Sequence, residues 1–373
     1  MIRVALLFGG RSSEHSISCA TAAGVLGAID RTRYQVIPIG ITRDGAWTLQ
    51  DDEVVARFAL GHEASELPQV VDNGSRVRLP ESASTREFTV AAPDGTVISL
   101  GDIDVAFPIL HGPFGEDGTV QGALELIGLP YVGNGVLASA LGMDKHFTKT
   151  ALEGAGIEVA PWVTVTRSDL AANRDLWQRR MQGLDLPVFV KPARAGSSVG
   201  VSKVTAWEQL DAALELAFAQ DHRVLVEAAI VGREIECGVL QGRDGAPPRV
   251  SLAGEILITG RDFYDFDAKY LGAAGIELVC PAALAPAELA EMQRMAIRAF
   301  DAIDGAGLAR VDFFLTDTGW VINEINTMPG FTPISMFPTC WLQSGYTYPA
   351  LIDELISVAL ARRSAPARVP LPA

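Results

Sequence analysis

Oxygen-bearing side chains interrupt an otherwise apolar segment at residues 309–330, ARVDFFLTDTGWVINEINTMPG. Its central TDTG is typical of a tight turn, so the segment is predicted to form a hairpin of two strands. Because side chains alternate between the faces of a strand, Arg310 and Asp312 share one face of the first strand. Glu324 and Asn326 share one face of the second. We expect the hairpin to bring two carboxylates and an amide together beside a guanidinium.

This hairpin has two interpretations. Two buried carboxylates without a compensating cation would repel each other at a cost of several kcal/mol. Carboxylate and amide oxygens suit Mg²⁺, which completes its shell with water and phosphate oxygens, so the three side chains are candidate metal ligands. The alternative is a structural ion pair between Arg310 and Asp312, with Glu324 on a solvated face. The segment alone leaves both open.

A second candidate site is VFVKPARAGSSVGVSKV, in which Lys191 ends a predicted strand and a loop rich in Gly and Ser follows. A cation with nearby backbone N–H groups and hydroxyls is suited to holding phosphates. The spacing matches neither a Walker loop nor a dinucleotide fingerprint. A flexible hairpin tip is the alternative.

Two glycine-containing turns could bring the backbone close to a ligand. HGPFGEDGTVQG has four glycines between residues 111 and 122, and its His111 is more often structural than catalytic. In GGRSSEHSIS, Glu14 lies in a strand-to-helix turn, where ligands gather at the ends of parallel strands. A helix-capping role is the alternative for Glu14.

Two further segments could complete a site. GRDFYDFDAKYLGAAG, residues 260–275, is bounded by glycines and contains Lys269 and Tyr270, so we expect an active-site lid. In VEAAI and the following GREIECG, Glu227 and Glu234 could meet a nucleoside, or the two segments could be an ordinary strand pair.

The elements that must position these residues follow an α/β pattern. The first third is predicted to be a parallel α/β unit, with strands near residues 4–8, 34–42 and 105–110 and a helix at 16–29. Residues 50–100 show little hydrophobic periodicity, and we interpret them as a long variable excursion to which we assign no catalytic or binding role. The last third has successive strands with one clear helix, which favours an antiparallel sheet.

Composition excludes several classes of partner. The net charge of -15 and the pI of about 4.8 disfavour nucleic acid and anionic membranes. The apolar run at residues 4–8 is too short for a signal-peptide core, and no stretch approaches the ~18 apolar residues of a membrane span. The four cysteines are scattered singly, which argues against a zinc site or disulfide framework and favours the reducing cytoplasm.

Taken in order, the motifs resemble the D-alanine–D-alanine ligase family of the ATP-grasp superfamily, from Gly9 to about Ser335. They are GGRSSEHSIS, HGPFGEDGTVQG, MDKHFTK, VKPARAGSSVGVSKV, VEAAIVGREIECGVL, DFDAKYLG, ARVDFFL and INEINTMPGFTPIS. The resemblance implies an α/β protein with the ATP-grasp fold, in which two α+β domains that sandwich ATP follow an N-terminal parallel α/β domain. The expected divisions are 1–120 for the N-terminal substrate domain, 121–208 for the central domain, 209–363 for the C-terminal domain and 364–373 for a frayed tail.

The implied reaction is the ligation of two D-alanines by ATP, through D-alanyl phosphate, for peptidoglycan synthesis. The resemblance implies two Mg²⁺ ions, with Mn²⁺ as an alternative, held by Asp312, Glu324 and Asn326. The residues implied for ATP are Lys145, Lys191, Ser197, Ser198, Glu227, Ile230, Glu234, Lys269, Asn323 and Glu324.

The resemblance also implies catalytic roles. Glu14 would take the ammonium group of the first D-alanine, and Ser197 and Tyr270 would link to Glu14. Arg310 and the backbone of Gly330 would stabilise the oxyanion of the tetrahedral intermediate, and Lys269 the transferring phosphoryl group. The carboxylate of the second D-alanine would be held by Ser335 and by the backbone of Met336.

Two residues limit the resemblance. Ala228, beside the adenine, stands where many relatives have a polar or basic residue, and Ala195 stands at a variable position of the phosphate loop. Neither removes a catalytic group. Tyr270 favours an amine over D-lactate as the second substrate. The alternatives are a D-alanine–D-lactate ligase, another ATP-grasp carboxylate–amine ligase, or a non-catalytic ATP-binding regulator. A homodimer is the family expectation.

Overall fold

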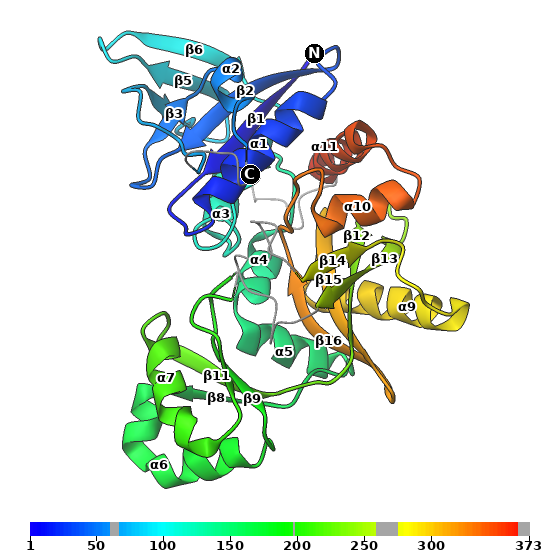
Figure 1. The fold of residues 1–373 in the computed structure, drawn as a ribbon. Helices are drawn as coiled ribbons and strands as arrows, with labels where there is room; N and C mark the ends of the chain where they lie inside the picture. Colours follow the sequence, from blue (N-terminus) through cyan, green and yellow to red (C-terminus); the bar gives the residue numbers. More distant parts are fainter. Residues whose placement is uncertain (60–66, 197, 259–274, 365–373) are drawn as a thin grey trace, which may run out of the picture.

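The computed structural model describes residues 1–59, 67–196, 198–258 and 275–364. Within these residues the strands form four sheets, arranged in three regions that follow one another along the chain (Figure 1). The N-terminal region is at one end of the molecule, and the other two regions face each other across α4 (Val136–Met143) and α5 (Lys145–Gly154). The predicted lid at 260–275 lies outside the described residues except for Gly275.

The N-terminal region is built on a sheet of order β3-β2-β1-β7. Strands β2 and β7 run parallel to β1, as predicted, and β3 is antiparallel to β2. Alternate side chains of β1 enter two cores: Leu6 and Phe8 face α1, whereas Ala5 and Leu7 face α3. The bounds are β1 Ile2–Gly9, α1 His15–Ala28, β2 Tyr34–Ile41, β3 Trp47–Leu49, β7 Val105–Pro108 and α3 Thr119–Leu126.

Residues 50–100 contain more regular structure than the sequence pattern predicts. They include the helix α2 (Asp52–Val55) and most of an antiparallel sheet formed by β4 (Arg76–Arg78), β5 (Glu87–Ala91) and β6 (Val97–Asp102). Val77, Phe88 and Val90 of this sheet are buried against the first sheet. The expectation of an unpatterned excursion is therefore wrong for this part, because strands of three to six residues are too short to show a periodic pattern.

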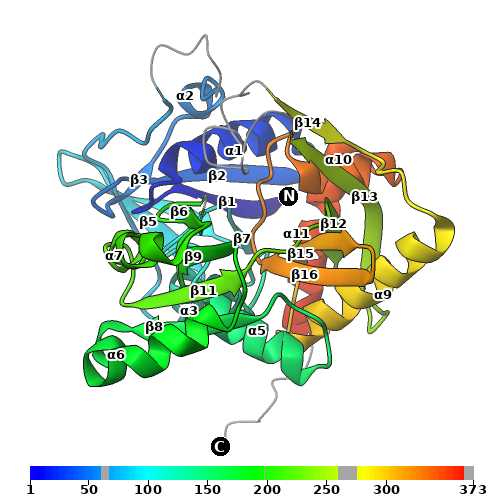
Figure 2. The same cartoon turned by 60° about the horizontal axis from the view of Figure 1, so that its bottom comes forward.

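The central region is an antiparallel sheet of order β10-β9-β11-β8, in which α6 and α7 contribute to the core on one face (Figure 2). Helix α6 is polar along most of its length and is not predicted by hydrophobic periodicity, although Thr166 and Asp169 form a capping box at its start. The bounds are β8 Trp162–Thr166, α6 Arg167–Gln182, β9 Val188–Pro192, β10 Ser202–Val204, η1 Trp207–Gln209, α7 Leu210–Phe218 and β11 Arg223–Ala228.

Strand β11 follows the expected domain boundary at residue 208, but it pairs with both β8 and β9. We therefore propose that the central domain continues to the end of β11.

The C-terminal region is the predicted antiparallel sheet, of order β14-β13-β12-β15-β16. One face packs on α9, α4 and α5 through a large apolar core. The opposite face carries the polar residues of the hairpin. The bounds are β12 Arg233–Leu240, β13 Arg249–Ile258, β14 Ile276–Val279, α9 Pro286–Ala302, β15 Leu308–Thr316 and β16 Gly319–Asn326.

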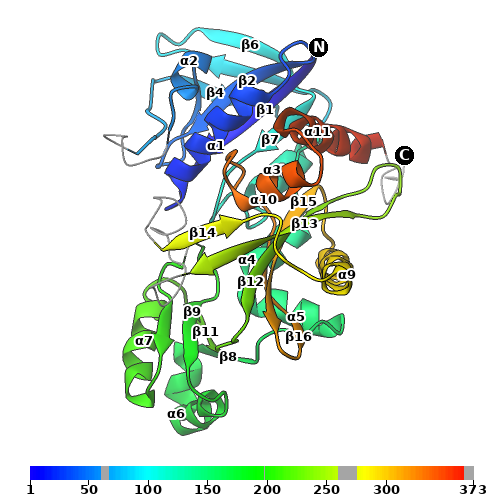
Figure 3. The ribbon, with the colours of Figure 1, turned by 45° about the vertical axis from the view of Figure 1, so that its right-hand side comes forward.

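After the hairpin the chain returns to the N-terminal region through α10 (Met336–Gln343) and α11 (Tyr348–Ser364), which lies beside β7 and α1 (Figure 3). Residues 365–373 of the predicted tail lie outside the described residues. Phe331 is fully buried where these elements meet, with ring centroids 6.1 Å from Phe107, 5.9 Å from Phe337 and 5.5 Å from Tyr348. Among the described residues, no helix has the length and apolar character needed to cross a membrane.

The aromatic contacts of Phe331 make a stability prediction. Phe331→Ala should lower the free energy of unfolding of the N-terminal region by about 3–5 kcal/mol, because it leaves a cavity between the first sheet and the C-terminal helices. Urea unfolding followed by fluorescence measures the loss. The control Leu126→Ala removes a side chain that is 83% exposed and should change the value by less than about 0.5 kcal/mol. Equal effects of the two variants would contradict the prediction.

Candidate active site

A cavity of about 1060 Å³ opens between the three regions. That volume is slightly above the roughly 300–1,000 Å³ typical of ligand pockets. It is lined from the N-terminal region by Glu14 and His111, from the central region by Lys191 and Glu227, and from the C-terminal region by the hairpin β15–β16. The candidate segments that the sequence keeps far apart therefore share one site.

The hairpin has the register that its alternation predicts. Asp312 is directly opposite Glu324, and Arg310 is opposite Asn326. A bulge follows Asp312, so that Asn323 is an extra residue without a partner in the register, and both Asn323 and Glu324 line the cavity.

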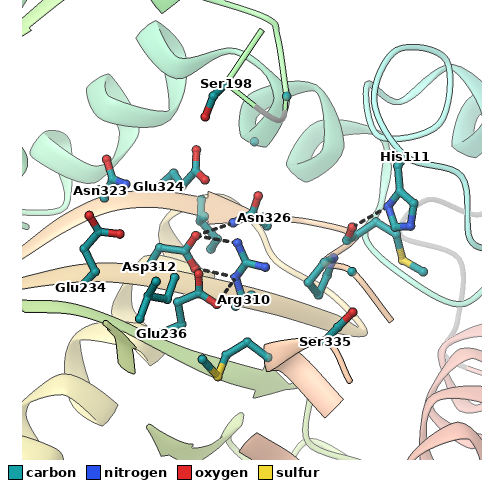
Figure 4. Close-up of a pocket in the computed structure, with 18 of the residues that line it drawn as sticks. His111, Ser198, Glu234, Glu236, Arg310, Asp312, Asn323, Glu324, Asn326 and Ser335 are labelled. Carbon is teal, nitrogen blue, oxygen red and sulfur yellow. Dashed lines mark hydrogen bonds and ion pairs between the residues drawn. The ribbon is translucent and has the colours of Figure 1, made fainter. Parts of the chain in front are cut away.

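Strand β12 adds an acid that the sequence analysis did not single out. Glu236 is opposite Asp312 on the other side of β15, so Glu236, Asp312 and Glu324 form one row across three strands (Figure 4). Glu236 is 6% exposed and its carboxylate is 3.1 Å from Nε of Arg310. The signal for it was the alternation in REIECGVL, which places Glu234 and Glu236 on the face opposite the buried Ile235 and Cys237.

Arg310 is the cation within this acidic row. Its Nε and one terminal nitrogen donate to the two carboxylate oxygens of Asp312, both at 2.7 Å. Burial alone would lower the pKa of Arg310, but Asp312 and Glu236 outweigh that effect and raise it well above its ordinary value. Asn326 donates to Asp312 at 3.0 Å. The structure therefore contains the ion pair between Arg310 and Asp312 that is one of the two interpretations of the hairpin.

The donor set also suits a magnesium ion. The carboxylates of Asp312 and Glu324 are directly opposite each other, and the amide of Asn326 lies two residues further along β16. All three side chains offer hard oxygen ligands on a pair of hydrogen-bonded strands. In the described part of the chain, no cluster of three or more His, Cys, Asp or Glu side chains has metal-binding geometry. The fit therefore depends on the amide of Asn326 and on oxygens that a ligand or water would bring.

At the opposite wall, one buried carboxylate joins two lysines. Glu227 is 3.0 Å from Nζ of Lys191 through one oxygen and 3.2 Å from Nζ of Lys149 through the other. Burial alone would raise the pKa of Glu227, but the two ammonium groups outweigh it and lower the pKa below its ordinary value. Nearby, Lys145 donates from Nζ to the carbonyl of Ala195 at 2.9 Å. Cations thus gather where the glycine-rich loop begins.

The remaining predicted nucleotide residues have different outcomes. Ile230, Glu234 and Asn323 line the same cavity. Ser198 also lines it and has a φ of +60°, a left-handed conformation that is uncommon for serine. The predicted positions Ser197, Lys269 and Tyr270 lie outside the described residues.

The N-terminal wall holds Glu14, which is 7% exposed, close to two glycines. A Cβ placed on Gly196 would lie 2.9 Å from a carboxylate oxygen of Glu14, and one on Gly112 would lie 3.1 Å from it, so a larger residue at either position would displace this carboxylate. Gly112 also has a φ of +72°, which favours glycine. At the far end of the cavity, Ser335 lies at the N-terminus of α10 and its hydroxyl is 2.7 Å from that of Thr332. Gly330 and Met336 line the cavity beside it.

Two further groups lie beside Glu14, the buried His111 and the half-buried Glu116. The Nδ1 of His111 donates to the carbonyl of Met328 at 3.2 Å, and burial lowers the pKa of His111. Glu116 accepts a hydrogen bond from the backbone N–H of Gly112 at 2.6 Å. Burial and, secondly, the charge of Glu14 raise the pKa of Glu116 to about 8. Glu116 lies in the glycine-rich segment HGPFGEDGTVQG. A glutamate in such a turn does not by itself indicate a raised pKa, because its neighbour Glu14 comes from another part of the chain.

Known proteins match the chain over nearly its whole length. Residues 3–134 match the family model described as "D-ala D-ala ligase N-terminus", and residues 151–357 match "D-ala D-ala ligase C-terminus". A D-alanine–D-alanine ligase of Pseudarthrobacter chlorophenolicus is 53% identical, over 97% of this chain and 95% of that protein.

Solved structures are similar too. The VanG D-Ala:D-Ser ligase of Enterococcus faecalis has a TM-score of 0.81 at 35% identity, over 96% of this chain and 99% of that one. The D-alanine–D-alanine ligase of Coxiella burnetii has a TM-score of 0.80 at 35% identity, over 97% and 95%.

The environment of Glu116 predicts a pH dependence of stability. In the unfolded chain Glu116 ionises near pH 4.5, whereas in the fold it keeps its proton to about pH 8. Between these values the folded state binds more protons, so this group makes the free energy of unfolding fall as the pH rises from about 5 to about 8. Glu116→Gln keeps an acceptor for the backbone N–H of Gly112. It should remove the contribution of this group to the fall of the free energy of unfolding with pH. Urea unfolding of both proteins across this range measures it, and parallel profiles would contradict the prediction.

Proposed function

Since the chain belongs to the D-alanine–D-alanine ligase family, we propose that the residues of the described cavity carry out that family's reaction in the roles set out below. The chain has the ATP-grasp fold and is an ATP-dependent ligase that joins two D-alanines for peptidoglycan synthesis. The observation that carries the assignment of roles is the meeting of Glu14, Lys191 and the β15–β16 hairpin in one cavity.

The hairpin is the proposed metal platform. Asp312, Glu324 and Asn326 would hold two Mg²⁺ ions, with Mn²⁺ as an alternative, and bound metal would neutralise the charge of the ATP phosphates. Both oxygens of Asp312 accept from Arg310, so a metal bound at Asp312 would share this carboxylate with the guanidinium. Glu236, 3.1 Å from Arg310, would then keep the guanidinium in place.

The nucleotide is proposed to lie between the central and C-terminal sheets. Lys145 and Lys191 would bind phosphate oxygens, and the loop at Ser197 and Ser198 would close over them. Lys269 would stabilise the transferring phosphoryl group. The backbone groups of Glu227 and Ile230 would meet the adenine, and Glu234 the ribose. Asn323 and Glu324 would complete the contacts beside the metal.

The amino acids are proposed to lie toward the N-terminal region. Glu14 would accept the ammonium group of the first D-alanine, with Ser197 and Tyr270 beside it. The carboxylate of that D-alanine would take the phosphoryl group to give D-alanyl phosphate. The amine of the second D-alanine, held by its carboxylate at Ser335 and the backbone of Met336, would then attack the acyl carbon.

Arg310 and the backbone of Gly330 would stabilise the oxyanion that forms during this attack. The side chain of Arg310 is only 15% exposed and is held by Asp312 and Glu236, so its charge is weakly screened by solvent and its geometry is set before the reaction. Catalysis would therefore rest on positioning and charge, with no covalent bond to the protein.

Partners and location complete the proposal. The net charge of -15 disfavours nucleic acid and anionic membrane surfaces as partners. We expect a homodimer in the cytoplasm, where ATP is available.

The proposed reaction has a direct test. With ATP, Mg²⁺ and D-alanine, the purified protein should release phosphate and form D-alanyl-D-alanine, whereas L-alanine should give no product. D-serine and D-lactate, offered with D-alanine, should give less mixed product than D-alanine gives dipeptide. Chromatography measures the product formed with each of the four compounds, D-alanine, L-alanine, D-serine and D-lactate. Absence of phosphate release with D-alanine would contradict the assignment, and a preference for D-serine or D-lactate would change the second substrate.

The metal platform has its own test. Glu324→Gln should lower turnover by more than about 100-fold, because it removes one charge from the metal ligands, while the variant still binds a non-hydrolysable ATP analogue. Turnover assays and calorimetry measure the two quantities. Asp317→Asn alters an exposed carboxylate at the turn of the same hairpin and should leave both unchanged. Normal turnover in Glu324→Gln would refute the metal assignment.

A further inference from the structure

Three charged side chains form a buried chain of contacts below the nucleotide end of the cavity. Lys149 comes from α5, Glu227 from β11 and Lys191 from β9. Glu227 lies between the two lysines and contacts each through a different oxygen, at 3.2 Å and 3.0 Å. We call these residues the Lys–Glu–Lys triad. Lys149 has no role in the proposed reaction.

The sheet explains why these side chains meet. Strands β9 and β11 are antiparallel neighbours, with Lys191 opposite Leu225 and Glu227 opposite Phe189. Alternate residues Val188, Val190, Val224 and Val226 enter the core below α6 and α7. Lys191 and Glu227 therefore point to the other face, toward the cavity, where α5 brings Lys149 against them.

The two lysines differ in exposure. The side chain of Lys149 is 3% exposed and that of Lys191 is 17% exposed. Lys149 also donates to the carbonyl of Ala160 at 3.2 Å, and its ammonium lies 5.5 Å from the ring centroid of Trp162. Both lysines line the cavity, but protein groups contact the ammonium of Lys149 from several sides, and Lys191 is the more exposed of the two to a phosphate in the cavity.

Counting charges shows what Lys149 contributes. Glu227 carries one negative charge and the two lysines carry one positive charge each, so the triad has a surplus of one positive charge. If Lys191 turned toward a phosphate without Lys149 present, Glu227 would be left as a buried carboxylate without a cation, which is strongly unfavourable. With Lys149 in place, Glu227 keeps a counter-ion and Lys191 can exchange its partner.

We propose that Lys149 is a positioning residue of the nucleotide site, which holds Glu227 in an ion pair and so releases Lys191 to bind the phosphates of ATP. The inference rests on the proposed function, in which Lys191 binds phosphate. It adds a residue that acts on ATP through Glu227 and touches neither ATP nor D-alanine.

The first test compares KM with kcat. In Lys149→Met, Lys191 should stay paired with Glu227, so the KM for ATP should rise by about tenfold or more while kcat changes by less than about threefold. The KM for D-alanine at saturating ATP should not change. Lys149→Arg keeps the charge and should retain most of the affinity. An unchanged KM for ATP in Lys149→Met would overturn the proposal.

The second test removes the negative charge of Glu227, which Lys149 is proposed to hold in an ion pair. In the double variant Lys149→Met, Glu227→Gln, no buried carboxylate retains Lys191, so the affinity for ATP should return to within about threefold of Glu227→Gln alone. Calorimetry with a non-hydrolysable ATP analogue measures this. The double variant leaves no buried unpaired carboxylate, so it gives a result even if Lys149→Met does not fold. Additive losses in the double variant would overturn the proposal and leave Lys149 a purely structural residue.

A stability control separates positioning from loss of structure. Met181→Ala alters the core on the other face of the same sheet, where Met181 is 1% exposed, and should lower the melting temperature without changing the KM for ATP. A rise in this KM equal to that of Lys149→Met would overturn the proposal. Dipeptide formation by the wild type, measured in parallel, tells a failure of this inference from a failure of the proposed function.

Discussion

The pairing of buried carboxylates with a small set of cations is the constraint on which the rest of the structure depends. Glu236, Asp312 and Glu324 form a row across three strands, and Arg310 contacts two of them. Removing one partner from such a cluster would leave an uncompensated charge in a medium of low dielectric constant. The strands must therefore hold their register, because a slip by one residue would move these groups into the apolar core on the opposite face.

The same principle operates at both ends of the cavity. The hairpin has an excess of carboxylates beside Arg310, which suits a metal cation, and the Lys–Glu–Lys triad has an excess of positive charge, which suits phosphates. A nucleotide–metal complex placed between them would offset both. In the proposed function the opposed charges would orient ATP, and Glu14 and Ser335 line the same cavity.

Local sequence patterns were sufficient to predict much of the fold, including the β15–β16 hairpin. Strands with strict alternation, such as β15 and β16, were predictable because one apolar face and one polar face specify the register. The strands β4–β6 and the polar helix α6 were not predictable from periodicity, since the former are short and the latter buries little apolar surface along its length. Candidate residues predicted from motifs, including Glu14, Lys191 and Asp312, line one cavity, whereas the charged partners of Glu116, Lys149 and Glu236 come from distant parts of the chain.

By itself the sequence determined the family, the order of the motifs and the face of the hairpin on which Arg310, Asp312, Glu324 and Asn326 lie, because alternation along a strand is a local property. Tertiary structure alone decided which charges became partners. Lys149 and Glu227 are far apart in the chain, as are Glu116 and Glu14, and burial and electrostatics depend on the groups that folding brings within a few ångströms. For Arg310, folding added Glu236 to the expected Asp312, so that the guanidinium has a second carboxylate to hold it.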